Sequence, residues 1–185
     1  MRIVAYAIVS ADGMLADRDR YMPDGLKVDA DQRFFSNGLD AADVVVHGRH
    51  SYEGHANSPR RRRLILTRRV DAVGQDPSNP KARLWNPAGA SFAAACAALG
   101  VSDGVAAVIG GTDVFGLFLE IGYDAFHLSR AANVRLPGGR PVFPQVPALM
   151  PEDVLANHGL EPGPPQVLDA AAGATLVTWE RKARQ

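Results

Sequence analysis

The sequence predicts one α/β domain with a mixed, mostly parallel β-sheet that helices cover on both faces. The first observation behind this prediction is a series of short apolar runs, which are typical of buried strands. The second is that segments with helical periodicity separate these runs. The third is a pair of short segments, 167–168 and 175–179, which indicate a C-terminal antiparallel hairpin. We therefore expect a three-layer fold with a sheet of about eight strands.

The apolar runs are expected to form the central strands. They carry few charges, and several of them end at glycine or at other turn-forming residues. The segment at the N-terminus is nearly continuously apolar, as in a strand that is buried on both faces. The expected strands are residues 2–9, 44–47, 64–66, 105–109 and 125–129.

Helices are expected between these strands. Asp29 is suited to cap a helix over residues 30–39, in which Phe34, Phe35 and Leu39 share one face. The other expected helices are a short one from Ser51, residues 90–99 with Gly100 as the stop, and residues 112–121. The expected loops, rich in aspartate, proline and glycine, are residues 14–28, 71–82 and 162–165.

Bulk properties exclude several classes of protein. The 185 residues suit a single domain, 1–185, and no linker interrupts them. The 20 basic and 20 acidic residues balance, whereas a protein that binds duplex nucleic acid usually has a basic surplus. Cys96 is the only cysteine, so no internal disulfide forms. Neither a signal peptide nor a membrane-spanning run of about 20 apolar residues is found. We expect a cytoplasmic protein that binds neither nucleic acid nor membranes.

Three of the expected strands turn, at their carboxyl ends, into segments suited to bind an anion. In an open α/β sheet, ligands bind at these ends, where helix N-termini present free N–H groups. Glycines let a phosphate approach the backbone, while hydroxyl and guanidinium groups supply donors. The segments are Gly48-Arg49-His50-Ser51, Thr67-Arg68-Arg69 and Ile109-Gly110-Gly111-Thr112-Asp113.

Each of these segments alone is also compatible with an ordinary turn whose arginines are solvated. None of them matches G-x-G-x-x-G or G-x-x-x-x-G-K-[ST], so Rossmann and P-loop sites are excluded. Together they indicate a site for a pyrophosphate and a separate phosphate. That combination describes NADP better than NAD.

The order of several motifs resembles the dihydrofolate reductase superfamily. The match covers residues 1–144, and its later part, residues 138–144, is similar to the reductase (RibD C-terminal-like) branch of riboflavin biosynthesis. The motifs are S-A-D-G, D-x-x-x-F, H-G-R-H-S-Y-E, L-T-R, I-G-G-T-D-V-F, H-L-S-R and G-G-R-P-V-F-P.

The resemblance implies NADPH as the cofactor and a dihydrofolate-reductase-like fold. It implies that the Gly-Gly peptide bond is often cis and that residues 13–22 form a mobile loop that closes over the nicotinamide. Within the implied site, Thr67 and Arg68 hold the 2′-phosphate. The cofactor-binding residues are Ala7, Ile8, Gly48, Arg49, His50, Ser51, Thr67, Arg68, Ile109, Gly110, Gly111, Thr112 and Asp113.

Asp31 is the candidate catalytic residue, because it matches the active-site acid of dihydrofolate reductases. A carboxyl group in an apolar cleft has a raised pKa and can deliver or relay a proton. Four residues on, Phe35 matches an aromatic residue that stacks on the substrate, and Ser129 matches a position near the polar edge of the substrate. The alternative for Asp31 is an aspartate on the helix surface.

The expected function is hydride transfer from NADPH to a pyrimidine- or pterin-like small molecule, as in 5-amino-6-(5-phosphoribosylamino)uracil reductase. A phosphorylated substrate would need a basic group, and spacing does not choose among Arg20, Arg33, Arg130 and Arg140. Dihydrofolate reduction is one alternative, although residues 22–26 lack the tryptophan and second proline of that enzyme. A non-catalytic NADPH-binding module is the other. We expect a homodimer and no bound metal.

Overall fold

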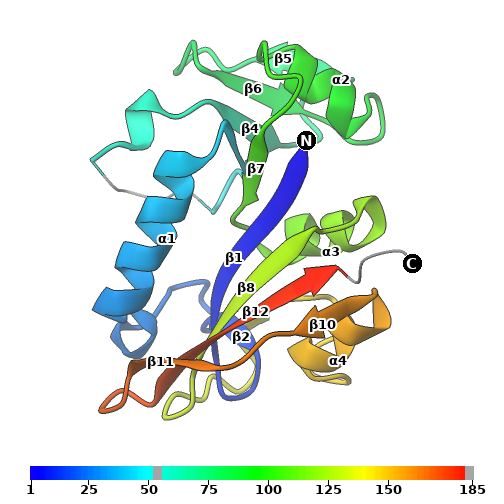
Figure 1. Cartoon of the computed structure of the whole chain (residues 1–185). Coiled ribbons are helices and arrows are strands. Elements are labelled where there is room, and N and C mark those ends of the chain that lie inside the picture. The colour runs from blue at the N-terminus through cyan, green and yellow to red at the C-terminus, as the bar shows by residue number, and fades with distance from the viewer. Residues whose placement is uncertain (52–55, 182–185) are drawn as a thin grey trace.

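The computed structural model describes residues 1–51 and 56–181, which form a ten-stranded mixed sheet and a separate two-stranded one (Figure 1). The strands are β1 (Arg2–Ser10), β2 (Met14–Ala16), β3 (Val44–Gly48), β4 (Arg63–Leu66), β5 (Val73–Gln75), β6 (Ala82–Trp85), β7 (Val105–Val108), β8 (Ala125–Ala131), β9 (Arg140–Pro141), β10 (Leu160–Pro162), β11 (Gln166–Asp169) and β12 (Ala174–Arg181). The helices are α1 (Asp29–Ala41), α2 (Phe92–Ala97), α3 (Thr112–Ile121) and α4 (Pro151–Asn157), with 3-10 turns at Asp24–Leu26 and Ser58–Arg60.

The large sheet has the order β10-β12-β8-β1-β7-β3-β4-β6-β5, and β11 pairs with β12. Its centre is parallel, since β1 pairs in parallel with both β7 and β8, and β3 does so with β4 and β7. Antiparallel pairs lie at the two edges, between β5 and β6 and around β12. The predicted α/β class and terminal antiparallel hairpin are confirmed.

The two faces of the sheet are covered by different helices, as Figure 1 shows for α1 on one side and α3 and α4 on the other. Successive residues of a strand point to opposite faces, so β1 contributes to both layers. Ile3, Ala5 and Val9 belong to the main core with residues of α2, α3 and α4. Tyr6 packs instead in the smaller cluster that includes Leu39 of α1. Helix α1 therefore packs on the face that carries Tyr6.

Several local predictions were wrong. Strand β2 and a 3-10 turn lie within the expected loop 14–28, and β5 lies within the expected loop 71–82. Strand β6, strand β10 and helix α4 were not predicted at all. These elements are short, with few residues to show a periodicity, and prolines or turn residues lie beside them. The expected loop at 162–165 begins one residue later, because Pro162 belongs to β10.

Helix boundaries also differ from the predicted ones. Asp29 is the first residue of α1 rather than its cap, and Val28 occupies the cap position without a side-chain hydrogen bond. Helix α2 is shorter than the expected 90–99, because the Ser91 side chain accepts a hydrogen bond from the Ala94 amide and fixes the start. The expected short helix from Ser51 falls on residues 52–55, which lie outside the described residues.

Candidate functional site

The three glycine- and arginine-bearing turns meet at one rim of the sheet, formed by the carboxyl ends of β3, β4 and β7. The Gly48 amide donates to the Gly110 carbonyl at 2.8 Å, which joins the turn after β3 to the turn after β7. The Ser51 amide donates to the Gly48 carbonyl at 3.0 Å. Gly48 pairs with Leu66 across β3 and β4, so the third turn begins beside it. The convergence expected from the sequence is therefore present.

At this rim, close packing and a positive φ require glycine at position 110. Gly110 has φ +90°, and a Cβ atom there would lie 2.5 Å from the Phe115 ring. A Cβ atom at Gly111 would meet the Ser51 hydroxyl at 3.4 Å. The Gly110–Gly111 peptide bond is cis, as the resemblance implied. The turn thus leaves an open stretch of backbone at the start of α3, where free N–H groups are suited to bind a phosphate.

A cavity of about 450 Å³ begins at this rim and extends between α1 and the sheet. Strands β1 and β8 form the floor of the cavity. Their register places Tyr6 beside His127 and Ile8 beside Ser129. Helix α1 supplies one wall, residues of the 13–22 loop a second, and the strand-end turns a third. The lining residues are Tyr6, Ala7, Ile8, Leu15, Ala16, Arg20, Met22, Asp31, Gln32, Phe34, Phe35, His50, Ser51, Ile109, Gly111, Phe115, His127 and Ser129.

Asp31 is the buried carboxyl group of this cavity. Only 8% of the residue is exposed, although it lies in the first turn of α1. Burial raises the pKa of Asp31, and a hydrogen bond with the Ser129 side chain offsets part of the rise. A carboxyl group in this setting holds a proton at a higher pH than an aspartate in water does. Asp31 and Ser129 therefore form a unit that can exchange a proton with a bound molecule.

Aromatic side chains surround the space beside Asp31. The Tyr6 and His127 rings lie 4.8 Å apart, and Phe34 meets His127 edge-on at 5.0 Å. Burial, with a smaller contribution from Arg2, lowers the pKa of His127 to about 4, so the imidazole is neutral near pH 7. Its Nδ1 lies 2.9 Å from the Thr178 hydroxyl. These flat, uncharged walls suit a planar heterocycle.

Sequence reasoning missed Tyr6, Phe34 and His127 as cavity residues. The position of His127 within a mostly apolar strand favours a structural role when the sequence is taken alone. The cavity position depends on the register between β1 and β8, which are more than a hundred residues apart along the chain. One local signal existed: Tyr6 and His127 are polar aromatic residues that lie between apolar neighbours in their strands.

The remaining predicted cofactor residues lie at the rim but do not line the cavity. Arg49, Arg68 and Asp113 are exposed. Thr67 is buried, and its hydroxyl accepts a hydrogen bond from the Arg69 amide at 3.2 Å. The Thr112 hydroxyl donates to the Pro141 carbonyl, which leaves the backbone N–H groups of this turn as its phosphate donors. Their roles in binding stay predictions.

The structure separates the four arginines considered for a substrate phosphate. Arg20 lines the cavity, on a loop that the Asp17 carboxylate braces by accepting from the Asp19 and Tyr21 amides at 2.9 Å each. Arg130 is committed elsewhere, because it donates to the Ser10 and Ala11 carbonyls and pairs with Glu152. Arg33 and Arg140 are exposed and do not line the cavity.

Two further properties concern the described part of the chain alone. No helix there has both the length and the apolar character needed to cross a membrane. Among residues 1–51 and 56–181, no three His, Cys, Asp or Glu side chains gather in a way that could hold a metal ion.

Comparison with solved structures places the chain in the dihydrofolate-reductase-like fold class and confirms that prediction. A protein from Shewanella sp. PV-4 described as a riboflavin biosynthesis protein superposes with a TM-score of 0.66 at 19% identity, over 99% of this chain and 100% of that one. Dihydrofolate reductase from Enterococcus faecalis, complexed with NADP(H) and RAB-propyl, superposes with a TM-score of 0.65 at 17% identity, over 98% and 97%.

A third solved structure is a diaminohydroxyphosphoribosylaminopyrimidine deaminase/5-amino-6-(5-phosphoribosylamino)uracil reductase from Thermotoga maritima. It has a TM-score of 0.60 and 14% identity, and the match covers 98% of this chain but 56% of the Thermotoga chain. No family model matches the sequence, and no curated protein matches it. At these identities the likeness concerns the fold, and these neighbours include reductases.

Proposed function

We propose that this chain is an NADPH-dependent reductase that transfers a hydride to a C=N bond of a planar nitrogen heterocycle or of a chain attached to it. The proposal depends on one observation. A single cavity is lined by Asp31, a buried carboxyl group of raised pKa, and by Ser51 and Gly111 of the two glycine turns. The two halves of a hydride transfer, a dinucleotide site and a proton source, therefore share one space.

The rim fits a dinucleotide in shape and in charge. Gly111 carries no side chain beside the Ser51 hydroxyl, and the N-terminus of α3 presents backbone N–H groups at this turn. Arg49 and Arg68 lie at the same rim and would contact the phosphates. When bound, NADPH would supply the hydride. The chain would supply the phosphate contacts and exclude water from the cavity.

The proton for nitrogen would come through Asp31. Hydride addition to the carbon of C=N leaves an electron pair on nitrogen, which takes up one proton. Asp31 is suited to deliver it because burial keeps its carboxyl group protonated to higher pH. Ser129 would hold the carboxyl group in place, and the rings of Tyr6, Phe34 and His127 would hold the planar substrate.

Within this class we favour a phosphorylated pyrimidine over dihydrofolate, because Arg20 lines the cavity and can pair with a phosphate. The test follows NADPH oxidation with a ribosylaminopyrimidine phosphate and with dihydrofolate. We expect turnover of the pyrimidine, with a KM that rises about tenfold or more in Arg20→Ala. Faster turnover of dihydrofolate would favour dihydrofolate reduction. NADPH binding without turnover of either would indicate a binding module.

A further inference from the structure

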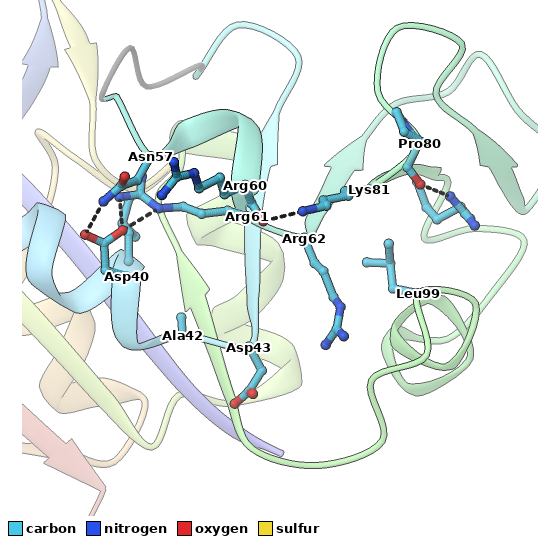
Figure 2. A pocket seen from close by; sticks show the side chains of 12 residues that line it. Asp40, Ala42, Asp43, Asn57, Arg60, Arg61, Arg62, Pro80, Lys81 and Leu99 are labelled. Atoms are coloured by element: carbon cyan, nitrogen blue, oxygen red, sulfur yellow. Dashed lines mark hydrogen bonds and ion pairs between the residues drawn. The ribbon is translucent and has the colours of Figure 1, made fainter.

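A second cavity lies at the opposite end of the sheet from the site above. Its volume is about 720 Å³, and Figure 2 shows the side chains that line it. Arg60, Arg61 and Arg62 stand directly before β4, and Lys81 stands directly before β6. The two strands are parallel neighbours, so these residues gather at the amino ends of the strands. One strand length, roughly 15 Å, separates them from the glycine turns.

The charges in this cavity do not cancel. Its basic side chains are Arg60, Arg61, Arg62, Lys81 and Arg83, and its acidic ones are Asp40 and Asp43. Both carboxylates are already engaged. Asp40 accepts from Arg61 at 2.6 and 3.1 Å and from Asn57 at 3.0 Å, and Asp43 accepts from the Val105 amide at 2.8 Å. The remaining cations are therefore available to a ligand.

Arg60 and Arg62 are the two cations of this cavity that have no hydrogen-bond or ion-pair partner for their side chains among residues 1–51 and 56–181. Both are exposed, and within the described residues neither guanidinium donates a hydrogen bond or pairs with a carboxylate. In Figure 2 the Arg62 side chain points away from the Asp40–Arg61 pair. Lys81 donates to the Arg60 carbonyl at 3.4 Å, and Arg83 donates to the Pro80 carbonyl at 3.1 Å, so backbone contacts hold both close by.

We propose that this basic cavity is a second ligand site, which binds a small oligophosphate such as the triphosphate chain of a nucleotide. Guanidinium groups bind phosphate oxygens in pairs, and several cations on separate strands match an anion with several charges. None of the lining residues is aromatic, so a base would find no stacking partner there. The site thus recognises the phosphate chain, and its ligand is distinct from the dinucleotide proposed above.

Calorimetric titration with inorganic tripolyphosphate tests this proposal, with ATP and orthophosphate as comparison ligands. We expect tripolyphosphate and ATP to bind alike and orthophosphate to bind at least tenfold more weakly. The double variant Arg60→Ala/Arg62→Ala should weaken tripolyphosphate binding about tenfold or more. Arg61 is left in place because it is buried against Asp40.

Two control variants decide where the anion binds. Arg135→Ala removes one exposed charge from the turn between β8 and β9 and should leave the affinity unchanged. Arg68→Ala removes a charge from the glycine-turn rim and should leave it unchanged too. A loss of binding in Arg68→Ala but not in the double variant would overturn the proposal. So would equal affinities of the wild type and the double variant, or no binding to the wild type.

Discussion

The two ends of helix α1 carry aspartates that differ in exposure and in the partners of their carboxyl groups. Asp40, in the last turn, is 39% exposed and is compensated by the buried Arg61 and by Asn57. Asp31, in the first turn, is 8% exposed, and the contact that offsets its burial is a hydroxyl group, Ser129. A carboxyl group held by a buried cationic partner belongs to a structural ion pair. One without such a partner, in a cavity, can do proton chemistry.

The largest expected difference between the two aspartates is in turnover. Asp31→Asn should lower kcat about 100- to 10,000-fold, because it removes the proton donor, and leave the dissociation constant of NADPH within about threefold. Asp40→Asn should leave kcat within about threefold. Steady-state NADPH oxidation measures kcat, and a fluorescence titration measures the dissociation constant of NADPH. Equal effects of the two substitutions on kcat would contradict the different roles given to Asp31 and Asp40.

A smaller effect is expected at the rim, where Arg68 is predicted to hold the 2′-phosphate. Arg68→Ala should weaken NADPH about 10- to 100-fold, since it removes a charge-assisted contact to a phosphate that NADH lacks. NADH affinity should change less than about threefold. Equal weakening of both dinucleotides in binding titrations would remove Arg68 from that role.

Stability should fall when Asp40 is removed. Asp40→Ala leaves the buried Arg61 without its carboxylate, which should lower the free energy of unfolding by about 1–2 kcal/mol, a range that allows for the partial exposure of Asp40. Urea denaturation measures it. The matched control is Asp103→Ala, an exposed aspartate, which should stay within about 0.5 kcal/mol of the wild type. No loss in Asp40→Ala would mean that the pair does not stabilise the fold.

The smallest expected effect concerns stability and pH. The difference in free energy of unfolding between the wild type and Asp31→Asn should change with pH. Because the pKa of Asp31 is raised in the folded state, the native protein holds its proton where the unfolded chain has lost it. As pH rises from 3.8 through the raised pKa, the wild type should lose stability relative to Asp31→Asn, by at most about 1.4 kcal/mol per pH unit. Urea midpoints between pH 4 and 8 measure this change. A constant difference across that range would contradict the raised pKa.

The structural features that depend on local sequence patterns are mostly predicted from the sequence. The central strands, helix α3 and the meeting of Gly48 with Gly110 follow from apolar runs and turn residues. Asp31 was predicted as the catalytic acid from a motif; the residue is buried in a cavity, and its role stays a prediction.

The features that the sequence does not predict depend on pairing between strands that are far apart along the chain. Strand β2 pairs with β9 across more than a hundred residues, and neither is long enough to show a period. Tyr6 and His127 share the cavity only through the register of β1 with β8. The basic cavity likewise depends on the parallel pairing of β4 with β6, a short strand that was not predicted.

A crystal structure of the protein soaked with NADPH tests the central claim most directly. The account predicts that the pyrophosphate lies against Gly48, Gly110 and Gly111, with the nicotinamide in the cavity beside Asp31. A dinucleotide bound away from this rim, or a nicotinamide pointing away from Asp31, would contradict it.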